Sequence, residues 1–172
     1  RFTKTSRFTN FTKDKRLNYS KLNLNPQLIH TLVTQSDVGD LFDSGLIHLG
    51  LNWKYENGSD LDIEPDKDTI KIIKTLANTV TVNLISLSKT LEKPIAKIAS
   101  IETIISLVRL FISGKINNQG LTAGLELANQ NPDTEIEKLL EEKGLIQISD
   151  DTALEAFVEL VIENNPKPVQ EY

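Results

Sequence analysis

Residues 65–91 have the sequence PDKDTIKIIKTLANTVTVNLISLSKTL, and a regular apolar pattern runs through almost all of it. Apolar side chains recur every three or four residues from Ile70 to Leu91, which is the spacing of one face of an α-helix. Pro65-Asp66 is a helix start signal. The β-branched run 79–82 locally favours a strand, but the helical period continues on both sides of it. We therefore expect one long helix here.

Start and stop residues predict shorter helices on both sides of this segment. Two helices are expected to open at Asn25-Pro26 and Ser36-Asp37, and two more at Ser100 and at Asn117 or Asn118. The remaining expected starts are Asn131-Pro132-Asp133, Ser149-Asp150-Asp151 and Asn165-Pro166, and the expected helix ends are Gly114 and Gly144. The predicted fold class is all-α: a long-helix domain followed by a small helical bundle.

The predicted domain organisation has three parts. Residues 1–22 show no apolar period and are expected to form a basic extended arm or a targeting remnant. Residues 23–98 are expected to form the helical domain and residues 99–172 the bundle, because Pro94 is a candidate boundary between them. The sequence begins with Arg1 and contains no Met, so we expect a processed product or a piece of a longer protein.

Composition excludes several classes of site. Aromatic residues make up only 6% of the chain while Leu and Ile dominate its apolar residues, which suits helix packing better than a sheet. The absence of Cys excludes disulfides and thiolate metal sites. The apolar runs are shorter than the roughly 18 residues of a membrane span, so no membrane contact is expected.

The net charge of −5 hides a strong asymmetry along the chain. Residues 1–21 carry seven basic residues and one acid, whereas residues 132–172 carry eleven acids and three lysines. In the basic segment, cations alternate with the aromatic residues Phe2, Phe8, Phe11 and Tyr19. This combination can neutralise phosphates and stack on unpaired bases. The candidate RNA-binding residues are Lys13, Lys15 and Arg16; the alternatives are a targeting remnant or a segment that wraps a protein partner.

The sequence predicts no catalytic, cofactor-binding or metal-binding residues. His30 and His48 lie on separate predicted helices without a partner at metal-ligand spacing. The acidic series in residues 60–66 lacks the glycine that a calcium loop requires at its sixth position, where Pro65 stands. Acids also cluster between residues 135 and 142, where we expect a solvated helix face with Lys138 paired to Glu141 or Glu142.

The C-terminal segment carries a family resemblance. Residues 142–151, with the sequence EKGLIQISDD, and residues 165–172, with the sequence NPKPVQEY, resemble the tail of B subunits of tRNA-dependent aspartyl/glutamyl-tRNA amidotransferases, the GatB/YqeY tail family. Residues 82–91 and 107–116 resemble the same family more loosely, with Leu84 where Trp is usual in the family. After the second of these segments, Gln119 and Thr122 stand where lysines are usual. The resemblance covers about residues 23–172 and leaves out the arm.

This resemblance implies a function and a set of partners. It implies the tRNA-positioning part of an amidotransferase B subunit, a carbon–nitrogen ligase with glutamine as amido donor, truncated at its C-terminus. It implies tRNA and the amidotransferase's A and C subunits, or a C-like subunit, as partners, with ATP and Mg²⁺ bound only by the complete subunit. The basic start and the divergent residues favour the mitochondrial matrix over a bacterial cytoplasm. The competing interpretation is a free-standing helical adaptor that binds proteins without contacting RNA.

Overall fold

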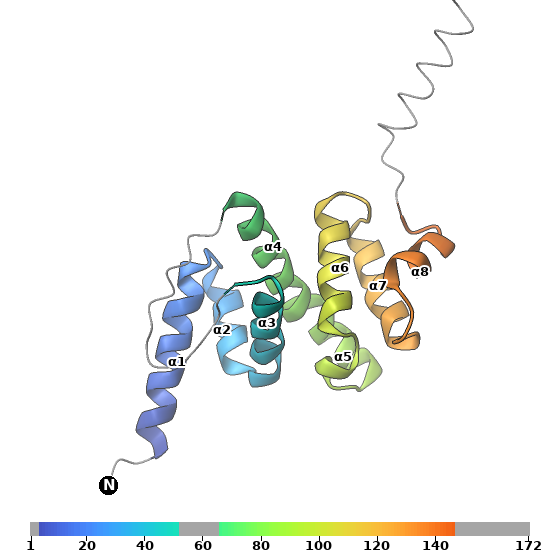
Figure 1. Ribbon diagram of the computed structural model, residues 1–172. Helices are drawn as coiled ribbons and strands as arrows, with labels where there is room; N and C mark the ends of the chain where they lie inside the picture. The colour runs from blue at the N-terminus through green and yellow to red at the C-terminus, as the bar shows by residue number, and fades with distance from the viewer. Residues whose placement is uncertain (1–3, 52–65, 147–172) are drawn as a thin grey trace, which may run out of the picture.

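The computed structural model describes residues 4–51 and 66–146, and this part of the chain is entirely helical (Figure 1). The predicted all-α fold class is therefore confirmed for these residues. The elements are α1 (Lys4–Lys21), α2 (Pro26–Thr34), α3 (Ser36–His48), α4 (Lys67–Asn78), the π-helical segment η2 (Thr79–Leu84), α5 (Ile85–Leu91), the 3₁₀ turn η3 (Ile95–Lys97), α6 (Ile101–Ile112), α7 (Asn118–Gln130) and α8 (Ile136–Glu142).

The extended conformation expected for the arm is wrong, because residues Lys4–Lys21 form the helix α1. Its C-terminal half packs through Lys15, Asn18, Tyr19 and Leu22, which are all buried and follow the helical spacing i, i+3, i+4, i+7. These four residues form the buried face of the segment. Lys15 and Asn18 are polar, so the spacing of apolar residues alone does not reveal this face. The helix packs against α2, beside which it lies in Figure 1.

The two helices predicted after the arm are confirmed. Asn25 caps α2, since its Oδ1 accepts a 2.8 Å hydrogen bond from the Leu28 amide, and Pro26 occupies the first turn. Leu28 and Leu32 of α2 are buried, as are Val38, Phe42 and Leu46 of α3. The two helices pack against each other and carry α1 on their outer side (Figure 1).

The long helix predicted from residue 66 is also confirmed, but it changes pitch in its middle. Asp66 caps α4 by accepting a 2.7 Å hydrogen bond from the Thr69 amide. The β-branched run widens the helix into the π-helical segment η2, where the Thr81 hydroxyl donates a 2.7 Å hydrogen bond to the carbonyl of Ala77. The chain then continues directly into α5, so the β-branched residues perturb the helix without ending it.

The helix Lys67–Leu91 is long and apolar enough to cross a membrane by length and composition alone. Because the core helix of a globular protein passes the same test, this is weak evidence for a membrane span. Its residues Ile73, Leu76, Ala77 and Val80 are fully buried against the other helices.

The last three described helices match the prediction except at the start of α8. Ser100 caps α6, Asn117 caps α7, and Gly114 and Gly144 have the positive φ angles of 75° and 64° that helix ends favour. The start predicted at Asn131-Pro132-Asp133 is wrong, because α8 begins at Ile136. Asn131 instead ends α7: its backbone amide and its Nδ2 both donate to the carbonyl of Leu127, at 2.9 and 3.1 Å.

One continuous hydrophobic core joins these helices from Tyr19 to Leu140. The core crosses the predicted boundary near residue 98, since α4 packs directly against α6. The division into domains 1–22, 23–98 and 99–172 therefore stays a prediction. The helices predicted at Ser149 and Asn165 lie outside the described residues.

Candidate functional site

A buried polar cluster holds α1 against α3. The ammonium group of Lys15 lies 3.1 Å from Oδ2 of Asp43, and the Tyr19 hydroxyl donates a 2.6 Å hydrogen bond to Oδ1 of the same carboxylate. Lys15 and Asp43 are 4% and 7% exposed, and Tyr19 is fully buried. The Lys15 ammonium group also lies 5.7 Å from the centre of the Tyr19 ring. The carboxylate therefore has both a cation and a hydroxyl donor in a site that excludes water.

Gly39 makes room for this cluster. A Cβ atom on Gly39 would overlap the backbone oxygen of Leu32 and would lie 3.0 Å from the Lys15 ammonium group. The absence of a side chain thus allows α2 and α3 to approach closely, with Lys15 inserted next to their contact.

The structure separates the three predicted RNA-binding residues. Lys13 and Arg16 are exposed on α1, and the Arg16 guanidinium lies 3.3 Å from Nδ1 of His30 on α2. Lys15 points into the protein and is ion-paired, so its geometry favours a structural role. Tyr19 is buried as well, so its ring is not available for stacking on a base. RNA contact by Lys13, Lys15 and Arg16 stays a prediction, with Lys13 and Arg16 as the accessible members.

The histidines and acidic residues considered as possible metal ligands do not form a metal site among the described residues. His30 and His48 are exposed, and the described residues contain no group of three or more potential metal ligands. Among the acids of residues 60–66, Asp66 caps α4, and the hydrogen bond from the Thr69 amide lowers the pKa of its carboxyl group. Residues 60, 62 and 64 lie outside the described residues.

The ion pair predicted for Lys138 is wrong. Its ammonium group lies 2.9 Å from Oε2 of Glu135, three residues earlier, instead of pairing with Glu141 or Glu142. The reason is the later start of α8, which places Glu135 at the helix N-cap and within reach of Lys138. The hydrogen bond to Glu135 raises the pKa of Lys138.

A basic face on the long helix was not predicted from the sequence. It consists of Lys67, Lys71, Lys74, Asn78, Val82, Ser86 and Lys89, all of which are exposed except the half-buried Lys74. Lys67, Lys71 and Lys74 follow the spacing i, i+4, i+7, so the pattern was present in the sequence. The spacing of the lysines was overlooked because the periodicity was assessed only for the apolar residues, which lie on the opposite face of the helix. None of the seven residues of this face is Asp or Glu.

The three residues that the resemblance singles out as unusual have different surroundings. Thr122 of α7 accepts a 3.2 Å hydrogen bond from Nδ2 of Asn83 in η2. Leu84 is fully buried, and Gln119 is exposed at the start of α7. Thr122 therefore contributes a contact between η2 and α7.

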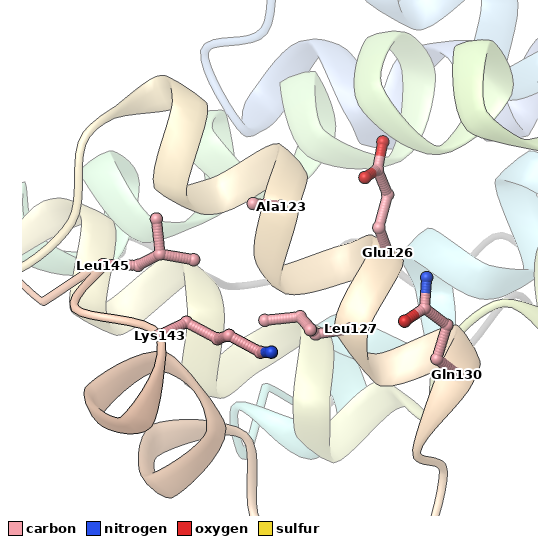
Figure 2. Close-up of a pocket in the computed structure, with 6 residues that line it drawn as sticks. All are labelled: Ala123, Glu126, Leu127, Gln130, Lys143 and Leu145. Carbon is pink, nitrogen blue, oxygen red and sulfur yellow. The ribbon is translucent and has the colours of Figure 1, made fainter.

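A shallow hollow lies between α7 and the end of α8. It has a volume of about 310 Å³ and is lined by Ala123, Glu126, Leu127, Gln130, Lys143 and Leu145. Figure 2 shows the Lys143 side chain extending across the hollow toward Leu127, while the Glu126 carboxylate points away from it. The hollow combines an apolar floor with single charges and holds no pair of groups arranged for acid–base or nucleophilic chemistry.

Comparisons with known proteins agree with the resemblance noted in the sequence. The chain is 38% identical over 72 residues to the B subunit of the aspartyl/glutamyl-tRNA(Asn/Gln) amidotransferase of Finegoldia magna, which covers 41% of this chain and 15% of that protein. It is 28% identical over 163 residues to the chloroplastic/mitochondrial B subunit of the glutamyl-tRNA(Gln) amidotransferase of Sorghum bicolor, which covers 92% of this chain and 25% of that protein.

A third relative is the mitochondrial B subunit of the glutamyl-tRNA(Gln) amidotransferase of Dictyostelium discoideum, which is 36% identical over 74 residues, or 42% of this chain and 14% of that protein. The chain thus spans a quarter or less of the length of these relatives. No solved structure matches it. The family model described as the GatB domain matches residues 67–172. Because this match covers more than half of the sequence, the chain belongs to the GatB/YqeY family.

Proposed function

We propose that this chain is the tRNA-positioning part of the B subunit of an amidotransferase that converts Glu-tRNA(Gln) or Asp-tRNA(Asn) to Gln-tRNA or Asn-tRNA. The observation that carries the proposal is the match of residues 67–172 to the GatB domain model. The names of the relatives from Finegoldia magna and Sorghum bicolor support it, since both are B subunits of such amidotransferases.

In the proposed function this chain binds and orients the body of the tRNA, and the chemical steps occur elsewhere in the complex. Contacts to phosphates set the register and orientation of a nucleic acid on a protein. A single core from Tyr19 to Leu140 makes the described helices a firm support for such contacts. We assign ATP and Mg²⁺ to the remainder of the complete subunit, because the resemblance of this chain covers only helical and tail parts. The A and C subunits of the amidotransferase, or a C-like subunit, are the proposed protein partners.

The proposed location is the mitochondrial matrix. Residues 1–21 are basic and nearly free of acids, as targeting segments are. The relative from Dictyostelium discoideum is named as mitochondrial, although bacterial relatives match at similar identity. Cell fractionation with an antibody against residues 66–146 should detect the native protein in the mitochondrial matrix, and detection in the cytosol alone would contradict this part of the proposal.

A chimera tests the tRNA-positioning function. The segment of the Sorghum bicolor B subunit that matches 92% of this chain is replaced by the matching residues of this chain, and the assembled amidotransferase is assayed for amidation of mischarged tRNA. The proposal predicts that the chimera keeps its activity and that a deletion of the same segment loses activity. The loss should appear mainly as a higher KM for the tRNA. A chimera that assembles with the A subunit but binds tRNA no better than the deletion would favour the adaptor interpretation.

A further inference from the structure

We propose that the basic face of the long helix, defined above by Lys67, Lys71, Lys74, Asn78, Val82, Ser86 and Lys89, is a surface that contacts tRNA phosphates. Lys67, Lys71 and Lys74 are the proposed phosphate-binding residues. The inference rests on the proposed function, since it names the surface of this chain that would hold the tRNA.

The distribution of charge is the first argument. The protein has a net charge of −5, yet this face combines four lysines with no carboxylate. Within the described part of the chain, none of the four lysines has an ion-pair partner. By comparison, Lys15, Lys115 and Lys138 are all ion-paired. The ammonium groups of the basic face are therefore not held in ion pairs and are available to an external anion, with the exposed Asp68 as the neighbouring carboxylate in the first turn of α4.

Helix stability does not explain these lysines. Lys67 is the first residue of α4, where a cation is disfavoured by the positive end of the helix dipole. Lys71 and Lys74 lie about 6 and 10 Å further along the axis, given a rise of about 1.5 Å per residue. Lys89, in the last turn of α5, is the member whose position the dipole favours. The three lysines of α4 thus form a row of positive charge that the helix dipole does not account for.

The middle of the face suits contact with a partner as well. Val82 is 58% exposed, which makes it one of the most exposed large apolar residues among those described. It lies in η2, where the wider π-helical turn interrupts the regular helix surface, and π-turns are frequent at functional sites. Asn78 and Ser86 flank it. Nδ2 of Asn78 donates one hydrogen bond to the carbonyl of Lys74, at 3.1 Å, so its second N–H and the Ser86 hydroxyl are the groups that can donate to phosphate or ribose oxygens.

The test compares two triple variants of the full chain. The first carries Lys67→Gln, Lys71→Gln and Lys74→Gln. The control carries Lys97→Gln, Lys138→Gln and Lys143→Gln, which removes the same charge from exposed lysines elsewhere. Binding of unmodified transcribed tRNA is measured by fluorescence anisotropy at increasing KCl concentration, starting from low salt. Circular dichroism checks that both variants stay folded.

The inference predicts that the first variant flattens the slope of log affinity against log salt by about 3 units, roughly one for each lysine that no longer neutralises a phosphate. The control should keep the slope of the unsubstituted chain. Equal slopes for the two variants would overturn the inference while leaving the proposed function standing. If the unsubstituted chain itself did not bind tRNA at low salt, the proposed function and this inference would both be wrong.

Discussion

The Tyr19 hydroxyl donates a 2.6 Å hydrogen bond to Oδ1 of Asp43, and this bond joins the first helix of the chain to the third. The other oxygen of the carboxylate is paired with Lys15, so one buried carboxylate holds two residues of α1. The Tyr19 ring also meets Phe42 edge-on, with ring centres 5.5 Å apart. The basic N-terminal segment is thereby an integral helix of the fold at its C-terminal end.

Removing the Asp43 carboxylate should strongly destabilise the protein. Asp43→Ala removes the nearest carboxylate of the buried Lys15 cation, which costs about 3 kcal/mol or more in the free energy of unfolding. The control is Asp40→Ala, because the Asp40 side chain is 76% exposed and lies 3.7 Å from Lys15; it should cost at most about 0.5 kcal/mol. Urea unfolding measures both, and equal effects would show that the cluster does not hold α1.

Two glycines at helix contacts should respond differently to substitution by alanine. In Gly39→Ala the new Cβ meets the backbone oxygen of Leu32, which cannot move without separating α2 and α3. In Gly124→Ala the Cβ meets only the end of the Leu107 side chain, which can rotate. Both glycines lie inside helices, so both substitutions gain about 1 kcal/mol of helix propensity. We expect Gly39→Ala still to cost about 1–3 kcal/mol, because it overlaps backbone, and Gly124→Ala to cost less. The reverse order of urea midpoints would contradict this account.

The cap of the long helix should make stability depend on pH. The pKa of Asp66 lies below its ordinary value of 3.8 in the folded protein, because the Thr69 amide donates to its carboxylate. A lowered folded pKa means that the stabilisation is present above pH 3.8 and is lost as the pH falls through the folded value. Asp66→Ala should therefore lower the urea midpoint at pH 7, and the difference should shrink as the pH falls below 3.8. A difference that stays constant with pH would exclude the carboxylate as its source.

The exposed cations of α1 should contribute to RNA binding without contributing to the stability of the protein. Lys13→Ala with Arg16→Ala should flatten the salt dependence of tRNA affinity by at most about 2 units and leave the unfolding midpoint unchanged. Lys15→Ala should instead lower the midpoint, because it removes the buried ion pair between Lys15 and Asp43. If the double variant keeps the full slope, α1 does not contact RNA and the targeting or protein-wrapping interpretation gains support.

Most of the helices could be predicted because their signals are local. A cap such as Asn25 or Ser100, followed by apolar residues at helical spacing, defines a helix start within a few residues. Asn131 shows where this logic fails, since the same residue type can end one helix instead of starting the next. The η2 segment could not be predicted, because β-branched residues indicate reduced helix propensity and not which helical pitch results.

The functional surfaces were harder to predict, because the neighbouring sequence does not show whether a charged side chain is buried or exposed. Lys15 and Arg16 are neighbours in a basic sequence, yet one is ion-paired in the interior and the other is exposed. Only the distant residue Asp43 decides between these outcomes. The lysines of α4 were visible at helical spacing, but only the folded structure shows that none of them forms an ion pair with another described residue.

Photo-crosslinking can show whether this chain contacts tRNA within an amidotransferase B subunit. The chimeric Sorghum bicolor protein described above is assembled into its amidotransferase and irradiated with tRNA that carries 4-thiouridine, and crosslinked peptides are identified by mass spectrometry. The account predicts crosslinks to peptides from this chain, including the helix Lys67–Leu91. Crosslinks confined to the other parts of the complex, in an assembly that still binds the tRNA, would contradict it.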